Sequence, residues 1–164
     1  MWFEMRRENL GFLERAPVVQ AAESTLKAPP AAVFAALVEP RGWKEWFPSV
    51  REVSYTSPPP HGVGTIREAN VAGTHWIEEI IAWDPSTRWA WTVTRASVPL
   101  ASAQVEVFDL MDDAGGTRVR WMLALEPRLL ARLGAPFTAG TVRRLFDRAM
   151  RNLDAHLDRG PAGR

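Results

Sequence analysis

The chain has 164 residues, of which 20 are basic and 19 acidic, so its formal charge of +1 provides no strong field to attract nucleic acid in bulk. Cysteine is absent, which excludes disulfides and thiolate metal sites and is typical of an intracellular protein. No stretch approaches the roughly 18 consecutive apolar residues of a membrane span, and the N-terminus has no signal-like apolar run. We therefore expect one cytoplasmic domain with no integral membrane association; its oligomeric state stays open.

The first 17 residues are interpreted as an N-terminal helical extension. Its apolar residues fall at positions that one helical face could hold, and Pro17 ends the element. The residues of that face are Trp2, Phe3, Leu10 and Leu13.

From residue 18 onward, short runs typical of strands alternate with prolines and turns. A first strand, residues 18–28, is followed by two short helical segments that end at Pro40 and Pro48. Further strands are expected near residues 50–56, 63–71, 74–83, 88–95, 101–111 and 117–126. The last two form a hairpin around the turn at residues 112–116.

The C-terminal part is predicted to be one long amphipathic helix, residues 138–158. Its apolar residues recur at three- and four-residue steps and form a wide stripe that includes Leu145, Ala149 and Leu153. Only the concave face of a sheet offers this stripe a partner of sufficient length. We therefore predict an α+β fold in which a curved antiparallel sheet wraps around the helix, with residues 159–164 as a flexible tail.

Tryptophan is unusually abundant, with eight residues against a single tyrosine. Several of the indoles lie in the expected strands between Gly62 and Val93. Indole rings carry a large apolar area and one N–H donor, and they line both ordinary cores and pockets for flat apolar ligands. The surplus is consistent with an aromatic core or with a wide interior that the rings only partly fill.

The order of elements resembles the helix-grip fold of the START-like, or SRPBCC, superfamily. Four phrases are similar to its polyketide cyclase/dehydrase-like branch: GWKEWFPSV from Gly42, GVGT from Gly62, EEIIAWDPSTRWAW from Glu78 and GGTRVRW from Gly115. The resemblance covers residues 18–158, which we take as a START-like ligand-binding domain. It implies an internal cavity for a hydrophobic ligand. Because the branch includes aromatase/cyclases as well as carriers of lipids and other hydrophobic ligands, it implies no particular catalytic residue.

A two-residue turn at Ala72–Gly73 predicts how the strands on either side of it pair. Val71 then lies opposite Thr74, and Arg67 lies opposite Glu78. Residues opposed in this way share one face of the sheet, so the pairing predicts an ion pair between Arg67 and Glu78. We expect this pair on the outer face, because the other face is richer in isoleucine and tryptophan.

With regular alternation, the face opposite that ion pair lines the cavity and carries a polar set among apolar walls. The members of this polar set are Glu68, Asn70, His75, Glu79 and Arg95. Buried charges need partners, and Glu79 and Arg95 would be diagonal neighbours across two strands. Trp76, Ile80 and Ala82, however, favour the opposite phase.

The candidate ligand-binding residues are the polar set together with apolar side chains of the strands and the terminal helix. These apolar candidates are Trp83, Trp89, Trp91, Trp121, Leu145 and Ala149. His75 and Glu79 are the candidates for acid–base catalysis. The polar set could instead be an ion pair that closes the cavity mouth, or a patch that orients a ligand carbonyl or hydroxyl group.

Other kinds of chemistry lack support in the sequence. The three histidines are too scattered for a metal site, no GxSxG motif is present, and no cofactor is implied. The sequence therefore predicts the binding or carriage of a small hydrophobic molecule, which could be aromatic, polyketide-like or lipid. The alternative is a polyketide cyclase, aromatase or dehydratase acting by acid–base catalysis in the same cavity. The ligand and the pathway are left open.

Overall fold

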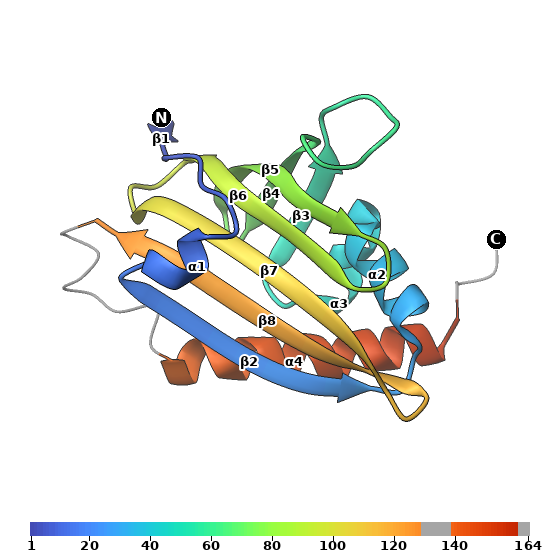
Figure 1. Cartoon of the computed structure of the whole chain (residues 1–164). Helices are drawn as coiled ribbons and strands as arrows, with labels where there is room; N and C mark the ends of the chain where they lie inside the picture. The colour runs from blue at the N-terminus through green and yellow to red at the C-terminus, as the bar shows by residue number, and fades with distance from the viewer. Residues whose placement is uncertain (129–138, 161–164) are drawn as a thin grey trace.

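The computed structural model describes residues 1–128 and 139–160, and Figure 1 shows the arrangement of their elements. The strands are β1 (Phe3–Glu4), β2 (Val18–Leu26), β3 (Val50–Tyr55), β4 (Ile66–Val71), β5 (Thr74–Asp84), β6 (Arg88–Ala96), β7 (Ala101–Asp113) and β8 (Gly116–Pro127). The helices are α1 (Phe12–Arg15), α2 (Pro30–Val38), the 3-10 turn η1 (Pro40–Gly42), α3 (Trp43–Trp46) and α4 (Ala139–Asp158).

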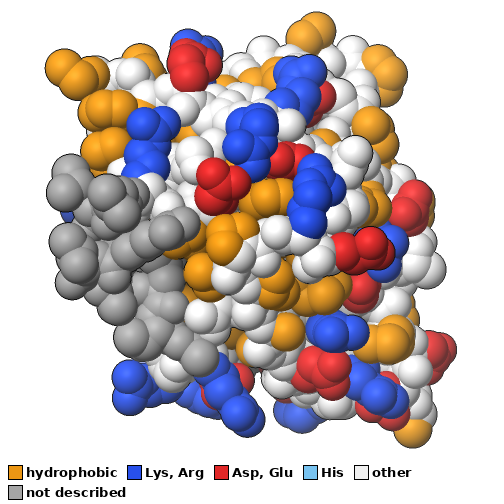
Figure 2. Space-filling model, turned by 60° about the vertical axis from the view of Figure 1, so that its left-hand side comes forward, with side chains coloured by type: hydrophobic (Ala, Val, Ile, Leu, Met, Phe, Trp, Pro, Cys, Tyr) orange, Lys and Arg blue, Asp and Glu red, His pale blue; other side chains and the backbone are white. Residues whose placement is uncertain are grey.

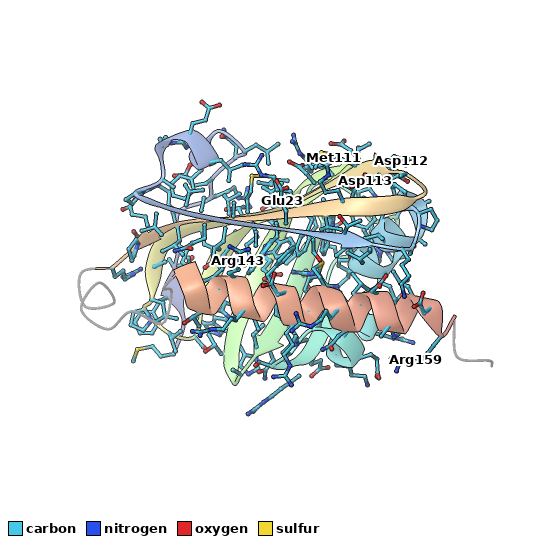
Figure 3. The ribbon with its side chains drawn as sticks, turned by 90° about the horizontal axis from the view of Figure 1, so that it is seen from below. Glu23, Met111, Asp112, Asp113, Arg143 and Arg159 are labelled. Carbon is cyan, nitrogen blue, oxygen red and sulfur yellow. The ribbon has the colours of Figure 1, made fainter. Side chains whose placement is uncertain are left out.

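The strands form one antiparallel sheet in the order β2-β8-β7-β6-β5-β4-β3, and β1 adds to β6. The sheet curves around α4, which lies along it in the views of Figures 1 and 3. The apolar stripe of α4 is buried as the sequence predicts: Phe146, Ala149 and Leu153 have no exposed surface. The predicted α+β helix-grip fold is confirmed.

The Ala72–Gly73 turn sets the pairing of β4 with β5. Ala72 and Gly73 have φ angles of 53° and 89°, the left-handed conformation that a two-residue hairpin turn requires. Val71 accordingly pairs with Thr74 and Arg67 with Glu78. The predicted register is therefore confirmed.

The N-terminal segment differs from the helical extension predicted for residues 1–17. It contains only the two-residue strand β1 and the single-turn helix α1, and in Figure 1 it crosses the sheet in front of β6 and β7. An isolated helix of about 13 residues is marginal in water, so tertiary packing decides the conformation of such a segment. Here the packing partner is the convex face of the sheet.

Phe12 anchors this segment in a small second core on the convex face. It is only 2% exposed. Its buried neighbours in this convex core are small or β-branched: Ala82, Ala90, Ala103, Val105, Val107 and Ala124. The absence of long side chains at these positions leaves room for the phenyl ring.

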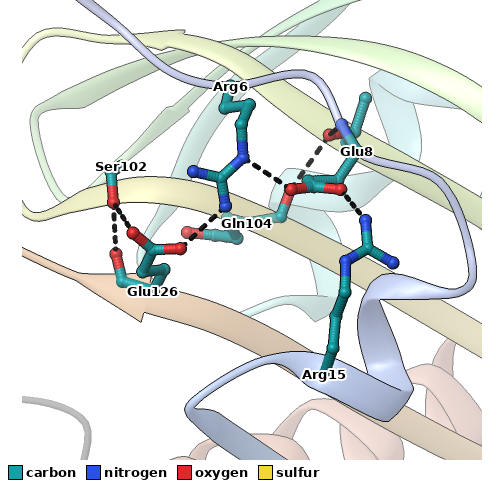
Figure 4. Close-up of polar contacts among 7 residues, drawn as sticks. Arg6, Glu8, Arg15, Ser102, Gln104 and Glu126 are labelled. Atoms are coloured by element: carbon teal, nitrogen blue, oxygen red, sulfur yellow. Dashed lines mark hydrogen bonds and ion pairs between the residues drawn. The ribbon is translucent and has the colours of Figure 1, made fainter.

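Polar contacts tie the same segment to the sheet (Figure 4). Glu8 accepts a hydrogen bond from Arg6 at 2.7 Å and pairs with Arg15. Arg6 also reaches Glu126 at 2.7 Å, and Glu126 accepts from Ser102 at 2.9 Å. The N-terminal segment is thus part of the folded structure.

The surface shows no dominant charge on the face in Figure 2, where acidic and basic side chains are interspersed with hydrophobic ones. Within residues 1–128 and 139–160, no helix is both long and apolar enough to cross a membrane. Residue 138 of the predicted terminal helix and most of the expected tail, residues 161–164, lie outside the described residues.

Candidate functional site

A cavity of about 190 Å³ lies between the concave face of the sheet and the helices α3 and α4. Its aromatic wall consists of Trp43, Phe47, Trp76, Trp91 and Trp121. Aliphatic side chains from β3, β4, β8 and α4 complete most of the remaining wall. Polar side chains also face this space, namely Arg67, Glu78, Gln104, Glu106 and Thr141.

Arg67 and Glu78 form a buried ion pair in this wall. The Arg67 Nε and Glu78 Oε2 atoms are 2.5 Å apart, and the two side chains are 2% and 7% exposed. The guanidinium carbon lies 4.3 Å from the ring centre of Trp91, 4.7 Å from that of Trp89 and 4.9 Å from that of Trp43. Aromatic faces attract cations, so these rings and Glu78 together offset the cost of burying the charge.

Two further properties of this pair matter for ligand binding. The Nη1 atom of Arg67 is buried and has no hydrogen-bond partner among the described residues. Burial raises the pKa of Glu78, while the positive charge of Arg67 acts in the opposite direction. The cavity wall therefore contains a compensated charge and one buried N–H group that no described group accepts.

Glu106 is the second buried carboxyl group of the cavity. Its Oε1 accepts a hydrogen bond from Gln104 Nε2 at 2.8 Å, and its Oε2 accepts one from Trp121 Nε1 at 3.0 Å. Burial, followed by the negative charge of Glu78, raises the pKa of Glu106 to about 7. A carboxyl group with such a pKa exists in both protonation states near neutral pH.

The face that lines the cavity corrects the predicted strand phase. Two β-bulges interrupt the pairing of β5 with β6: Ile81 on β5 and Thr94 on β6 have no partner in the register. Each extra residue shifts the alternation of inward and outward side chains by one position. On β5, between the bulge at Ile81 and the Ala72–Gly73 turn, Glu78 therefore points inward, and so does its partner Arg67 on β4.

The polar set predicted to lie inside the cavity is outside it. Glu79 pairs with Arg7 of the N-terminal segment, and the guanidinium carbon of Arg95 lies 5.7 Å from the ring centre of Trp2. The remaining members contact one another: His75 lies 3.4 Å from Glu68 and 3.1 Å from Asn70. None of these five lines the cavity. His75 and Glu79 therefore do not form an acid–base pair there.

The apolar candidates divide into two groups. Trp91, Trp121 and Leu145 line the cavity, so their role in ligand binding stays a prediction. Trp89, Trp83 and Ala149 are not among the lining residues. Trp89 lies behind the wall with its ring centre 4.9 Å from that of Trp91, and Trp83 contacts Phe34, Tyr55 and Trp89. Ala149 is buried on the side of α4 that packs against the rest of the core.

Gln104 and Glu106 were not anticipated from the sequence. Both lie on the same face of β7 as Phe108, which is fully buried. The alternation of side chains along the strand could therefore have identified them as buried residues. The other face of β7 carries Val105 and Val107, which are equally buried in the convex core. With apolar residues on both faces, the alternation did not show which face lines the cavity.

Metal binding has no support in the described part of the chain, where no three histidine, aspartate or glutamate side chains gather in one place.

Comparison with known proteins gives a consistent family assignment. A family model described as polyketide cyclase/dehydrase and lipid transport matches residues 18–158. An uncharacterized protein of Mycobacterium tuberculosis is 32% identical over 123 residues, which is 74% of this chain and 74% of the relative. An uncharacterized protein of Mycobacterium bovis matches to the same extent.

Solved structures share the fold. A START superfamily protein from Mycobacterium smegmatis matches with a TM-score of 0.66 and 10% identity, over 86% of this chain and 97% of that one. A protein of Thermus thermophilus matches with a TM-score of 0.65 and 21% identity, over 85% and 99%. A protein of Mesorhizobium loti matches with a TM-score of 0.66 and 20% identity, over 88% and 100%. At these identities the likeness is one of fold.

Proposed function

Since the chain belongs to the polyketide cyclase/dehydrase and lipid transport family, within the START-like superfamily, we propose that its cavity binds and carries a small, largely apolar ligand. The cavity itself is the observation that carries this proposal: it encloses about 190 Å³ behind a wall with five aromatic residues. An apolar cavity of about 150 Å³ accommodates benzene. A ligand with one aromatic ring therefore fits.

Burial of the ligand against aromatic rings supplies the affinity. Removing apolar surface from water contributes roughly 25 cal/mol per Å², and a stacked aromatic pair adds about 1 kcal/mol. Trp91 of β6 and Trp121 of β8 line the cavity, and Phe108 of β7 stacks between their rings. A ring bound against this aromatic wall buries most of its surface without an ion pair.

Titration of single-ring ligands, followed by tryptophan fluorescence and calorimetry, tests this proposal. Benzyl alcohol and indole are suitable first probes. We expect binding by the wild type and a loss of at least tenfold in affinity in Trp91→Ala and in Trp121→Ala, because each variant removes a wall of the cavity. Trp2→Ala is the matched control, since Trp2 is 43% exposed in the N-terminal segment. Equal affinities in all three variants would place binding elsewhere, and no binding of any probe contradicts the proposal.

A second candidate function is that of a cyclase, aromatase or dehydratase. Glu106 favours it, and Glu106 takes the acid–base role that the sequence assigned to His75 and Glu79. General acid–base catalysis works best with a pKa near the working pH, and that of Glu106 is about 7. In its protonated form Glu106 can donate a proton to a leaving hydroxyl group; in its ionised form it can take one from a carbon next to a carbonyl. Arg67 lines the same cavity, and its Nη1 has no partner among the described residues, which supports Arg67 as the donor for that carbonyl oxygen. Turnover by the wild type and not by Glu106→Gln would favour this candidate over carriage.

A further inference from the structure

The charges that face the cavity do not balance one another. One cation, Arg67, faces two carboxyl groups, Glu78 and Glu106. Arg67 is bonded to Glu78 at 2.5 Å. The hydrogen-bond donors that hold Glu106 are the uncharged groups of Gln104 and Trp121. Within the described residues Glu106 thus has no ion-pair partner of its own.

The surroundings of Glu106 supply hydrogen bonds to the ionised carboxylate but no positive charge to balance it. Two N–H donors, one on each oxygen, favour the ionised form, whereas burial and the charge of Glu78 on β5 oppose it. Arg67 on β4 favours ionisation less strongly than these effects oppose it. The side chains that α3 and α4 place in the cavity wall carry no charge. A buried carboxyl group in this position needs either a proton or an incoming cation.

The walls around Glu106 also suit a cation. Ring faces carry negative potential, and five aromatic residues line the cavity. Arg67 already shows this preference, since its guanidinium carbon lies within 5 Å of three ring centres. A carboxylate ligand would meet Arg67, whose charge is already paired with Glu78, and would face two carboxyl groups and the negative faces of the rings. Beside an uncharged ligand, only a proton could neutralise the Glu106 carboxylate.

We infer that the preferred ligand of the cavity is an organic cation, a protonated amine on a single ring or a short chain, whose positive charge is balanced by Glu106. This inference rests on the proposed function, because it names the chemical class of the ligand that the same cavity takes. The ammonium group lies against the Glu106 carboxylate, and the apolar part of the ligand lies against the tryptophan rings. Below its pKa of about 7, Glu106 releases its proton to the solvent when the amine binds.

Three probes of the same size separate the classes of ligand: benzylamine as the cation, benzyl alcohol as the neutral form and benzoate as the anion. Calorimetric titration of the full chain at pH 8 is expected to give at least tenfold tighter binding of benzylamine than of benzyl alcohol. Benzoate is expected to bind more weakly than both. Because Glu106 with a pKa of about 7 must be ionised to receive the amine, benzylamine affinity is expected to fall about tenfold from pH 8 to pH 6. Benzyl alcohol affinity is expected to change little over this range.

Glu106→Gln is expected to abolish both the preference for benzylamine and its pH dependence, while benzyl alcohol still binds. Glu14→Gln, which removes an exposed carboxyl group in α1, serves as the control and is expected to behave as the wild type. Circular dichroism establishes that each variant is folded. If Glu106→Gln does not fold, the pH dependence of the wild type decides the question.

The outcomes distinguish this inference from the proposed function. Equal binding of benzylamine and benzyl alcohol, tighter binding of benzoate, or a benzylamine affinity that does not fall at pH 6 overturns the inference and leaves carriage standing. Binding of none of the three probes overturns the proposed function and this inference with it.

Discussion

Glu106 makes the stability of the protein depend on pH. Burial and the charge of Glu78 raise its pKa from 4.5 to about 7, so the folded chain binds this proton more tightly than the unfolded chain does. Between pH 4.5 and 7 the folded state carries more protons, and the free energy of unfolding therefore falls as the pH rises through this window. At about 1.4 kcal/mol per pH unit, the loss by pH 8 is at most about 3.5 kcal/mol.

Replacement of Glu106 by glutamine removes this titrating group. We expect Glu106→Gln to unfold with a free energy about 1–3 kcal/mol higher than that of the wild type at pH 8, and to show a shallower decline between pH 5 and pH 8. Urea unfolding followed by circular dichroism at intervals of one pH unit measures both effects. Glu14→Gln is expected to keep the decline of the wild type. A decline as steep in Glu106→Gln as in the wild type would contradict this account.

At the scale of residues, pairing could be predicted from the sequence, whereas the side on which a pair lies could not. The turn at Ala72–Gly73 is local, and it sufficed to place Arg67 opposite Glu78. The choice of face depends on partners far along the chain, such as Trp43 of α3 and Trp91 of β6, which surround the guanidinium group. An arginine and a glutamate on adjacent strands give no indication that such rings are present.

At the scale of elements, the two bulges explain why the predicted polar residues on β4, β5 and the end of β6 lie outside the cavity, whereas Trp91 of β6 lines it. Trp91 points inward as predicted, but Ile81 is an extra residue on β5 between Ala82, the partner of Ala90, and Ile80, the partner of Trp91. A bulge changes the face of every residue beyond it, and nothing in an Ile-Ile-Ala sequence marks its position. The alternation carried from β6 back into β5 therefore selected Glu79 in place of Glu78.

Helix α4 could be predicted because its signal is local and repeated over many turns. Its buried side chains follow the helical period from Val142 to Leu153. We expect Leu153→Asp to lower the free energy of unfolding by several kcal/mol, since Leu153 has no exposed surface and an aspartate there would be a buried charge without a partner. Chemical denaturation measures this change. Ala155→Asp, at an exposed position of the same helix, is expected to cost less than about 1 kcal/mol; similar losses in both variants would mean that α4 is placed wrongly.

At the scale of the whole molecule, the sheet has a core on each face. The concave face holds the cavity and α4, and the convex face holds Phe12 with the small residues beneath it. The N-terminal segment could not be predicted from its own residues, because its conformation depends on this packing. Only the folded sheet presents the alanines and valines that Phe12 covers.

Phe12→Ala tests the contribution of the convex core. The substitution empties a site in which the ring is 2% exposed, and we expect it to lower the free energy of unfolding by about 3 kcal/mol. The affinity for single-ring probes is expected to stay within about twofold of the wild type, because the cavity lies on the other face. Thermal unfolding and the fluorescence titration provide the two measurements. An unchanged free energy of unfolding in Phe12→Ala would show that the N-terminal segment does not stabilise the sheet.

The small side chains of the convex core have a consequence for how relatives of this protein vary. Ala82, Ala90, Ala103 and Ala124 are tolerable in the sheet because Phe12 covers them, yet Phe12 lies outside the region, residues 18–158, that the family shares. A relative without an aromatic residue ahead of β2 would leave a shallow apolar hollow on this face. We expect such relatives to carry larger side chains at one or more of the four alanine positions. The length of the N-terminal segment and the size of these sheet residues are thus expected to be inherited together.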